Sequence, residues 1–284
     1  MQNTEGIRNT AIGYRALYFN IDGGQNTANG YQALYRNTIA DRNSAHGFQA
    51  LRNNTEGTGN SASGYRALYN NTTGNYNSGF GYSANSVGTI FSNSTGVGYN
   101  ADNTASNSVV VGNTSVNSIG GQVGWTTLSD GRFKKNIRND EVKGLEFITG
   151  LKPVTYNYDV HAKENWMEEN FGERDESEWE GKYDIESMRF SGFIAQDVEA
   201  LSKSLGYEFS GVDAPTNSKD IYGLRYADFV VPIVKSVQEL NDLIHEKDKE
   251  IESLKRSNTE FQKQLMENTK AIQELQEKLK SIKD

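Results

Sequence analysis

Small, aromatic and polar residues recur at a fixed spacing along the first hundred residues of the chain. A glycine returns every 17 residues, an aromatic residue follows it directly, and an alanine stands three positions after it. The glycines are Gly13, Gly30, Gly47, Gly64, Gly81 and Gly98. An Asn-Ser or Asn-Thr pair precedes the first five of them by four residues. Six copies of one pattern indicate an internal repeat, which determines how the rest of the fold is interpreted.

The repeat is too short for a pair of helices, and its glycine and asparagine content disfavours helix. We therefore predict one coil of a β-solenoid per repeat, with glycine and asparagine supplying the positive φ angles of the turns. The small residues are expected to face a crowded interior and the aromatic residue to cap the next coil. One coil buries little, so stability must come from stacking and, we expect, from other chains. A monomeric solenoid is the alternative.

The repeat changes after Gly98, since the Val109–Gly112 segment arrives fourteen residues later instead of 17. This shift predicts a narrower terminal coil.

A second pattern begins at Ile233, where apolar residues alternate at spacings of four and three. With Ile233 at position d of a heptad, the a positions are Val237, Ile244, Ile251, Asn258, Leu265, Ile272 and Leu279. The d positions are Leu240, Lys247, Leu254, Phe261, Asn268, Leu275 and Ile282. Seven heptads without interruption predict a left-handed coiled coil. Several layers with Ile at a and Leu at d favour a dimer. A coaxial fibre, however, shares one symmetry along its whole length. We therefore expect three chains, the number implied by the family resemblance given below. A helix packed on its own domain is the alternative.

The amino-acid composition argues against several kinds of site and partner. The chain has 284 residues, 35% of them hydrophobic, no cysteine and only three histidines. Disulfides, thiolate zinc sites and a histidine-based metal site are therefore not expected, and no cofactor is predicted. The net charge of −8 argues against binding to nucleic acid or to anionic membranes, and no apolar run is long enough for membrane insertion. No leader is visible, and Met1 falls within the repeat, so whether it is the native start stays open.

Charge also divides the chain near residue 129. Residues 1–128 carry six arginines, no lysine and five acidic residues, whereas residues 129–284 carry 23 basic and 32 acidic residues. Two unlike structures therefore meet at the segment Ser129-Asp130-Gly131-Arg132-Phe133-Lys134-Lys135-Asn136-Ile137.

Further phrases follow this junction in a fixed order: Leu151–Tyr158, Gly192–Glu199 and Leu224–Tyr226. With the Ser-Asp-x-Arg-x-Lys-x-x-Ile motif, they resemble the intramolecular chaperone domain of phage tailspikes and fibres (the S74 peptidase family) over about residues 126–250. The Asn-Thr-Ala-x-Gly-Tyr-x-Ala-Leu phrase resembles the head repeats of trimeric autotransporter adhesins and stalk repeats of phage tail fibres. That second resemblance implies a left-handed trimeric β-solenoid.

The S74 resemblance implies a cut between Leu128 and Ser129, with Ser129 as nucleophile and Lys134, rather than Lys135, as its partner. Chemistry agrees, because a serine hydroxyl needs a base and no histidine lies nearby in the sequence. A lysine acts as a base only when neutral, which requires burial or neighbouring positive charge.

Three other residues are candidates for supporting roles. Arg132 supplies positive charge near the lysine, and Asp130 opposes it, although the two residues fit a structural turn and ion pair equally well. Gln196 is a candidate to polarise the scissile carbonyl or hold the loop. A structural hydrogen bond after a buried strand is at least as good an interpretation of Gln196.

The stretch from His161 to Ser187 is rich in acidic residues. They are Glu164, Glu168, Glu169, Glu173, Asp175, Glu176, Glu178 and Glu180. Paired carboxylates serve glycoside hydrolysis or calcium binding, but the regular calcium-loop spacing is missing. We therefore predict a solvated insertion and no metal site.

The sequence thus predicts a multidomain fibrous protein. Residues 1–125 form a homotrimeric β-solenoid, residues 126–228 an α+β intramolecular chaperone domain and residues 229–284 a trimeric coiled coil. The preferred function is the distal part of a homotrimeric fibre whose C-terminal domain drives assembly and then cuts itself once, as a serine endopeptidase. The alternative is an uncleaved structural or adhesive fibre tip. We expect a virion tail fibre, a fibre of a contractile injection apparatus or a bacterial surface protein, with a cell-surface receptor or glycan as partner.

Overall fold

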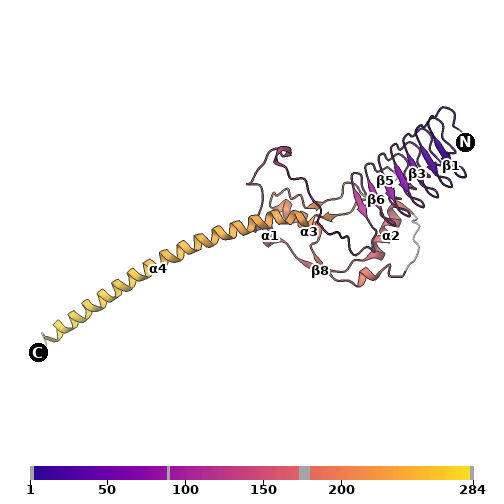
Figure 1. Cartoon of the computed structure of the whole chain (residues 1–284). Coiled ribbons are helices and arrows are strands. Elements are labelled where there is room, and N and C mark those ends of the chain that lie inside the picture. The colour runs from indigo at the N-terminus through magenta and orange to yellow at the C-terminus, as the bar shows by residue number, and fades with distance from the viewer. Residues whose placement is uncertain (1–2, 88–89, 173–179, 282–284) are drawn as a thin grey trace. The chain divides into compact units, whose positions relative to one another are not determined.

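The computed structural model describes residues 3–87, 90–172 and 180–281 (Figure 1). The chain divides into two compact units, and neither is continuous in sequence. The first contains Met1–Phe133, Pro153–Ala195 and Asp213–Gly223, and the second contains Lys134–Lys152, Gln196–Val212 and Leu224–Asp284. Each unit is described by itself.

The first unit begins with a stack of short parallel strands. Seven strands form one sheet in sequence order: β1 (Thr10–Ile12), β2 (Thr27–Asn29), β3 (Ser44–His46), β4 (Ser61–Ser63), β5 (Ser78–Phe80), β6 (Thr95–Val97) and β7 (Val109–Val111). Thr10 pairs with Thr27, and the same shift of 17 residues repeats up to β6. Between β6 and β7, Thr95 pairs with Val109, so the last coil is three residues shorter. The predicted β-solenoid and its narrower terminal coil are confirmed.

The interior of the solenoid contains one small residue per coil and, in the first four coils, one leucine. From β2 to β6 the middle residue of the strand is buried while the third points to solvent. Leu17, Leu34, Leu51 and Leu68 are fully or almost fully buried between these strands and the alanines that follow each repeat glycine. Stacking within a single chain therefore buries this core, as predicted, and a further contribution from other chains stays a prediction.

Asparagine has a different role from the one predicted. Asn20, Asn37, Asn54 and Asn71 are buried, and each side-chain amide donates to the carboxamide oxygen of the corresponding asparagine one coil earlier. The same amide also donates to a backbone carbonyl three residues ahead, as Asn37 does to Ala40 at 2.9 Å. These side chains satisfy their own polar groups and those of the turn, which burial otherwise makes costly.

Positive φ angles occur at all six repeat glycines, as predicted, and also at residue types for which they were not predicted. In each coil from Gly13 to Gly81, the second and fourth residues after the repeat glycine adopt φ near +50°, for example Gln32 and Leu34. Both donate backbone hydrogen bonds to neighbouring coils, Gln32 to Tyr14 and Leu34 to Ala50. The ladder of backbone bonds thus imposes a conformation that costs a non-glycine residue about 1 kcal/mol. Asparagine takes it at Asn85, Asn93, Asn100, Asn107 and Asn136.

The repeat glycine is required by close packing of the coils. A Cβ atom on Gly47 would lie 2.4 Å from the carbonyl oxygen of Gly64, and φ at Gly47 is +130°. The aromatic residues that follow the glycines stack along the solenoid, with ring centroids 5.0 Å apart for Tyr31 and Phe48 and 4.6 Å apart for Tyr65 and Tyr82. The predicted aromatic cap on each neighbouring coil is confirmed.

The remainder of the first unit is a small α+β region. Its elements are η1 (Gly131–Phe133), β8 (Val154–Tyr156), α2 (Val160–Phe171), η2 (Asp184–Ser187) and β9 (Phe190–Gly192). Strands β8 and β9 pair antiparallel. The short strands β10 (Val212–Asp213) and β11 (Gly223–Leu224) pair where the chain passes between the units.

The second unit has a compact aromatic core. It contains α1 (Leu145–Gly150), α3 (Ala195–Ser204, whose first residue belongs to the first unit), η3 (Tyr226–Phe229) and α4 (Val230–Ser281). Phe147 of α1 is fully buried, and its ring contacts those of Tyr207, Phe209 and Phe229. The Glu239 carboxylate of α4 accepts a hydrogen bond from the Leu145 backbone N–H at 2.6 Å, which satisfies an otherwise unpaired donor at the start of α1. Packing thus joins α1 to the first turns of α4.

Helix α4 continues for 52 residues, and every described side chain after Leu240 is exposed (Figure 1). Most apolar heptad positions on it are exposed in the single chain: Val237, Leu240, Ile244, Ile251, Leu254, Phe261, Leu265, Ile272 and Leu275. We call these residues the heptad stripe. The predicted long helix is confirmed, whereas its assembly with other chains stays a prediction. Ile282 lies outside the described residues. None of the described helices is long and apolar enough to cross a membrane.

Candidate functional site

The predicted cleavage segment is solvent-exposed in the single chain. Leu128 is 77% exposed, Ser129 is also exposed, and η1 begins two residues after the serine. Neighbouring apolar side chains are similarly uncovered, including Trp125 at 92% and Phe133 at 71%. A folded chain seldom leaves so many large apolar side chains in water along one short segment.

Asp130 and Arg132 form the turn that follows the serine. The Asp130 carboxylate accepts hydrogen bonds from the backbone N–H and the guanidinium of Arg132, the shortest at 2.6 Å. The bidentate side-chain hydrogen bond from Arg132 holds the pKa of the Asp130 carboxyl below its usual value. Of the two roles left open for this pair, the observed geometry is that of a structural turn. The Arg132 charge is already partnered by a carboxylate, so it is a poor source of positive potential for a nearby lysine.

Lys134 and Gln196 belong to the second unit, whereas Ser129 belongs to the first. Lys134 is exposed, and Gln196 is exposed in the first turn of α3, four residues after the end of β9. The single chain therefore brings Asp130 and Arg132 together, and it leaves both members of the predicted Ser129–Lys134 dyad in contact with solvent.

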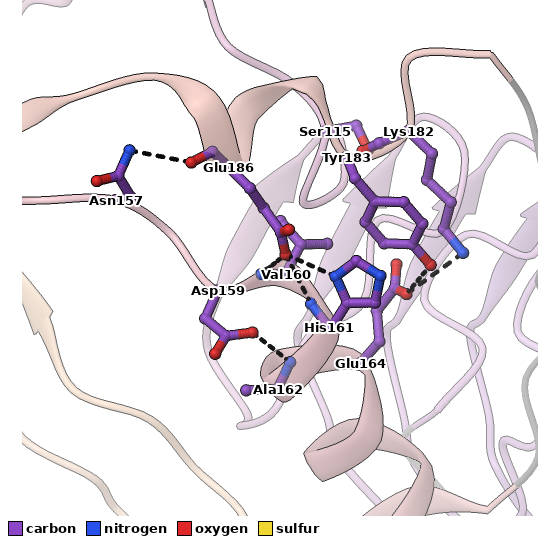
Figure 2. A network of polar contacts seen from close by, with 10 residues as sticks. All are labelled: Ser115, Asn157, Asp159, Val160, His161, Ala162, Glu164, Lys182, Tyr183 and Glu186. Atoms are coloured by element: carbon purple, nitrogen blue, oxygen red, sulfur yellow. Dashed lines mark hydrogen bonds and ion pairs between the residues drawn. The ribbon is translucent and has the colours of Figure 1, made fainter.

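A polar network that the sequence analysis missed surrounds the start of α2 (Figure 2). The Glu186 carboxylate accepts hydrogen bonds from the backbone N–H groups of Val160 and His161 and lies 2.8 Å from the His161 ring nitrogen Nδ1. The His161 side chain is the main cause of a lowered pKa at Glu186. Asp159 completes the helix cap by accepting from the Ala162 N–H. The acidic side chain thus orders the first turn of α2.

The same network continues to a buried ion pair. Lys182 Nζ lies 3.3 Å from the Glu164 carboxylate, with the lysine side chain only 3% exposed and the glutamate 12%. The Tyr183 hydroxyl donates to the same carboxylate at 3.0 Å, and the Tyr183 ring stacks on His161. Figure 2 shows the side chains of Lys182 and Tyr183 converging on Glu164. A charge this well buried is tolerated because it is paired and hydrogen-bonded.

The predicted solvated insertion is confirmed for the exposed residues of 161–187 and is wrong for the part that packs around Lys182. Met167, Lys182 and Ile185 are buried, and Glu164 and Glu186 form specific bonds. Glu168, Glu169 and Glu180 are exposed, as predicted. Glu173, Asp175, Glu176 and Glu178 lie outside the described residues. The sequence contains one usable signal for this ion pair, a lysine between glycine and tyrosine in a stretch rich in acidic residues.

Comparison with known proteins agrees with the junction motif. Residues 129–207 match the family model Peptidase_S74, described as chaperone of endosialidase, and the match begins at Ser129. No curated protein matches the chain, and neither does any solved structure. The match covers well under half of the chain and confirms the predicted resemblance over this region. A β-solenoid, a chaperone-like domain and a long C-terminal helix together fit a fibre protein whose chaperone domain has a role in trimerisation and folding.

Proposed function

We propose that this chain is the distal part of a homotrimeric fibre that its own C-terminal region assembles and then cuts between Leu128 and Ser129. The match to the chaperone family that starts at Ser129 is the observation that carries the proposal. Within it, the heptad stripe of α4 gathers three chains and raises their effective concentration, so that slow long-range pairing in the solenoid begins in register.

The exposure of the heptad stripe supports assembly through α4. Nine large apolar side chains at a and d positions of one helix face solvent, three, four or seven residues apart, for instance Ile251 at 47% and Leu254 at 63%. An isolated helix gains nothing from such a stripe, whereas a coiled coil buries it at a and d positions. Asn258 and Asn268 then lie in the interior and specify register at some cost in stability.

The cleavage step is an acyl transfer. The Ser129 Oγ attacks the Leu128 carbonyl carbon as Lys134 accepts the hydroxyl proton. The peptide C–N bond then breaks, the Ser129 amine takes up a proton, and an ester joins Leu128 to the Ser129 side chain. Water hydrolyses this ester to a Leu128 carboxylate and regenerates the Ser129 hydroxyl. Fragments 1–128 and 129–284 result.

Assembly supplies the condition that this chemistry needs. Lys134 is exposed in the single chain, where water stabilises its charged form. Burial against neighbouring chains favours the neutral amine, which is the form that acts as a base. The exposed apolar side chains of Trp125, Leu128 and Phe133 provide the surface for such packing. Cleavage therefore follows trimerisation.

The test is the intact mass of purified protein under denaturing conditions. Native protein is expected to give two fragments, the second beginning at Ser129. Ser129→Ala should give one intact chain, and Lys134→Ala should slow the cut by about a hundredfold or more. Lys135→Ala is the matched control and should cut normally. All three variants should remain trimeric in sedimentation, since none changes the heptad stripe.

Two results would contradict the proposal. A fragment that begins at residue 129 in the Ser129→Ala protein would remove this serine from the mechanism. An intact native chain in a trimeric protein would leave the second function, an uncleaved structural or adhesive fibre tip. In either case we place the fibre on a virion tail, a contractile injection apparatus or a bacterial surface, with a surface receptor or glycan as its target.

A further inference from the structure

The end of the solenoid nearest the chaperone region is not left open. Strand β7 is the last strand of the sheet, and its edge would expose backbone groups and the side chain of Val110. Solenoids need their terminal coils covered to be soluble and stable. Residues 153–195 and 213–223 belong to the same compact unit as the solenoid, so they are in position to cover this end. We call residues 98–116 the terminal coil, and residues 160–172, 180–187 and 213–223 the cap segments.

Specific hydrogen bonds join the cap segments to the terminal coil. The Thr104 hydroxyl donates to the Asp220 carboxylate at 2.9 Å, and the Asn217 amide donates to the Thr104 carbonyl at 3.3 Å. The Ser115 hydroxyl donates to the Lys182 carbonyl at 2.6 Å. These three bonds link residues 67 to 116 positions apart in sequence, so they are tertiary contacts and not features of a local turn.

The cap groups that receive these bonds are held in place beforehand. Asp220 also accepts from the backbone and hydroxyl of Thr216 and from the Ile221 N–H. Lys182, whose carbonyl accepts from Ser115, is held by the buried ion pair to Glu164 (Figure 2). Groups fixed in advance lose little conformational entropy when they bind.

A cavity of about 480 Å³ lies between the two surfaces. Its lining includes Thr104 and Val110 from the terminal coil and Met167, Lys182 and Tyr222 from the cap segments. A mixed polar and apolar lining of this size accommodates ordered water between two partly complementary faces, as is common where surfaces associate without fusing into one core.

We infer that the cap segments form a docking surface for the terminal coil, which holds the C-terminal region on the solenoid without a covalent link. The three hydrogen bonds join residues before Leu128 to residues after Ser129. The cut proposed above therefore severs the chain but none of these bonds. The consequence for release rests on the proposed function: cleavage alone does not free the C-terminal fragment, which departs only when the docking surface opens.

The experiment introduces a cut that does not depend on self-cleavage. A recognition sequence for a specific protease is inserted between Gly120 and Gly121 of a Ser129→Ala chain. Neither glycine is closely packed, since an added Cβ would have no neighbour nearer than 3.6 Å. After protease treatment, the two fragments are expected to co-elute in native size-exclusion chromatography at micromolar concentration and to separate in denaturant.

Two variants test the bonds themselves. Thr104→Val with Ser115→Ala removes both hydroxyl donors and should weaken fragment association at least tenfold. Asp220→Asn, which leaves the solenoid sequence intact, should weaken it several-fold. Ser118→Ala with Thr126→Val, two exposed positions in the connecting segment, is the matched control and should leave association unchanged.

Separation of the fragments immediately after the cut would overturn the inference, as would equal association in the double variant and its control. Neither outcome bears on the proposed function, because trimerisation is measured by sedimentation and self-cleavage by the mass of the native Ser129 chain. Circular dichroism of the double variant shows whether its solenoid remains folded. If the solenoid of the double variant is unfolded, the fragment association measured for Asp220→Asn tests the inference instead.

Discussion

At the scale of single residues, stability of the solenoid rests on buried carboxamides as much as on apolar side chains. Asn54 is fully buried and joins three coils, because it donates to Asn37 and Gly57 and accepts from Asn71. Both ends of the carboxamide are therefore used, which is what a buried polar group requires. The asparagine ladder therefore favours one register of the coils, because a shift of one coil relative to the next would break the hydrogen bonds between its asparagines.

Replacing Asn54 with alanine should destabilise the solenoid by about 2–4 kcal/mol, because it leaves a buried donor on Asn71 and a buried acceptor on Asn37 without partners and removes one of the two side-chain hydrogen bonds that the Gly57 carbonyl accepts. Urea unfolding followed by circular dichroism measures this loss. Asn53→Ala is the control in the same coil, where the side chain is partly exposed and its bond to Asn70 is 3.5 Å long. Equal losses in the free energy of unfolding of the two variants would show that the buried asparagine ladder contributes no more to stability than a partly exposed asparagine does.

The Asp220 carboxylate gives the docking surface a predictable response to acid. Burial alone would raise its pKa, but hydrogen bonds from Thr216, Thr104 and Ile221 outweigh burial and lower it below the ordinary value. A carboxyl with a lowered pKa stabilises the fold above about pH 4 and loses that contribution as the pH falls through its native value. The melting-temperature advantage of the native chain over Asp220→Asn should therefore be constant from pH 7 to 5 and shrink below pH 4. An advantage that persists unchanged at pH 3 would contradict this account.

At the scale of elements, α4 has two parts with different partners. Its first turns pack on α1, where Glu239 accepts a hydrogen bond from Leu145, and its remaining length presents the heptad stripe to solvent. Deletion of all residues from 229 onward would therefore damage the chaperone core as well as assembly. A point substitution in the exposed part separates these effects.

Ile251→Asp should abolish trimerisation at micromolar concentration, because it places a charge in each chain at one layer of a coiled-coil interior. Sedimentation equilibrium measures the change in mass. Ser253→Asp adds the same side chain two residues away, off the a and d positions, and should stay trimeric. The Ile251→Asp chain should also remain uncut, since Lys134 stays exposed without assembly. A monomer that still cuts itself would separate the chemistry from assembly.

The helices and strands that follow a regular spacing of residues could be predicted from the sequence. Features that depend on tertiary contacts could not. The 17-residue spacing predicted the strands and the glycine and aromatic ladders, because each follows from the repeat alone. It did not reveal that Arg15 and Leu17 would take positive φ, because that conformation is imposed by hydrogen bonds between coils. The Lys182–Glu164 pair was missed for the same reason, since 18 residues separate two groups that only the fold brings together.

At the scale of the whole molecule, the candidate site shows the same limit. The motif from Ser129 to Ile137 identified the region that matches the chaperone family. It left open whether Asp130 and Arg132 would pair with each other, and it could not reveal that the single chain would leave Lys134 exposed. Those properties depend on local turn geometry and on which surfaces assembly covers.

The uniform register of the strands makes the length of the solenoid adjustable. Thr27 pairs with Ser44 and Ser44 with Ser61, so removal of residues 44–60 would join Asn43 to Ser61 and let Thr27 pair with Ser61 in the same geometry. The terminal coil, its docking surface and α4 would be unchanged, and the stack would shorten by about 4.8 Å, the spacing of neighbouring strands. Gain or loss of whole 17-residue units therefore changes the length of the solenoid without altering the terminal coil or the segments that follow it.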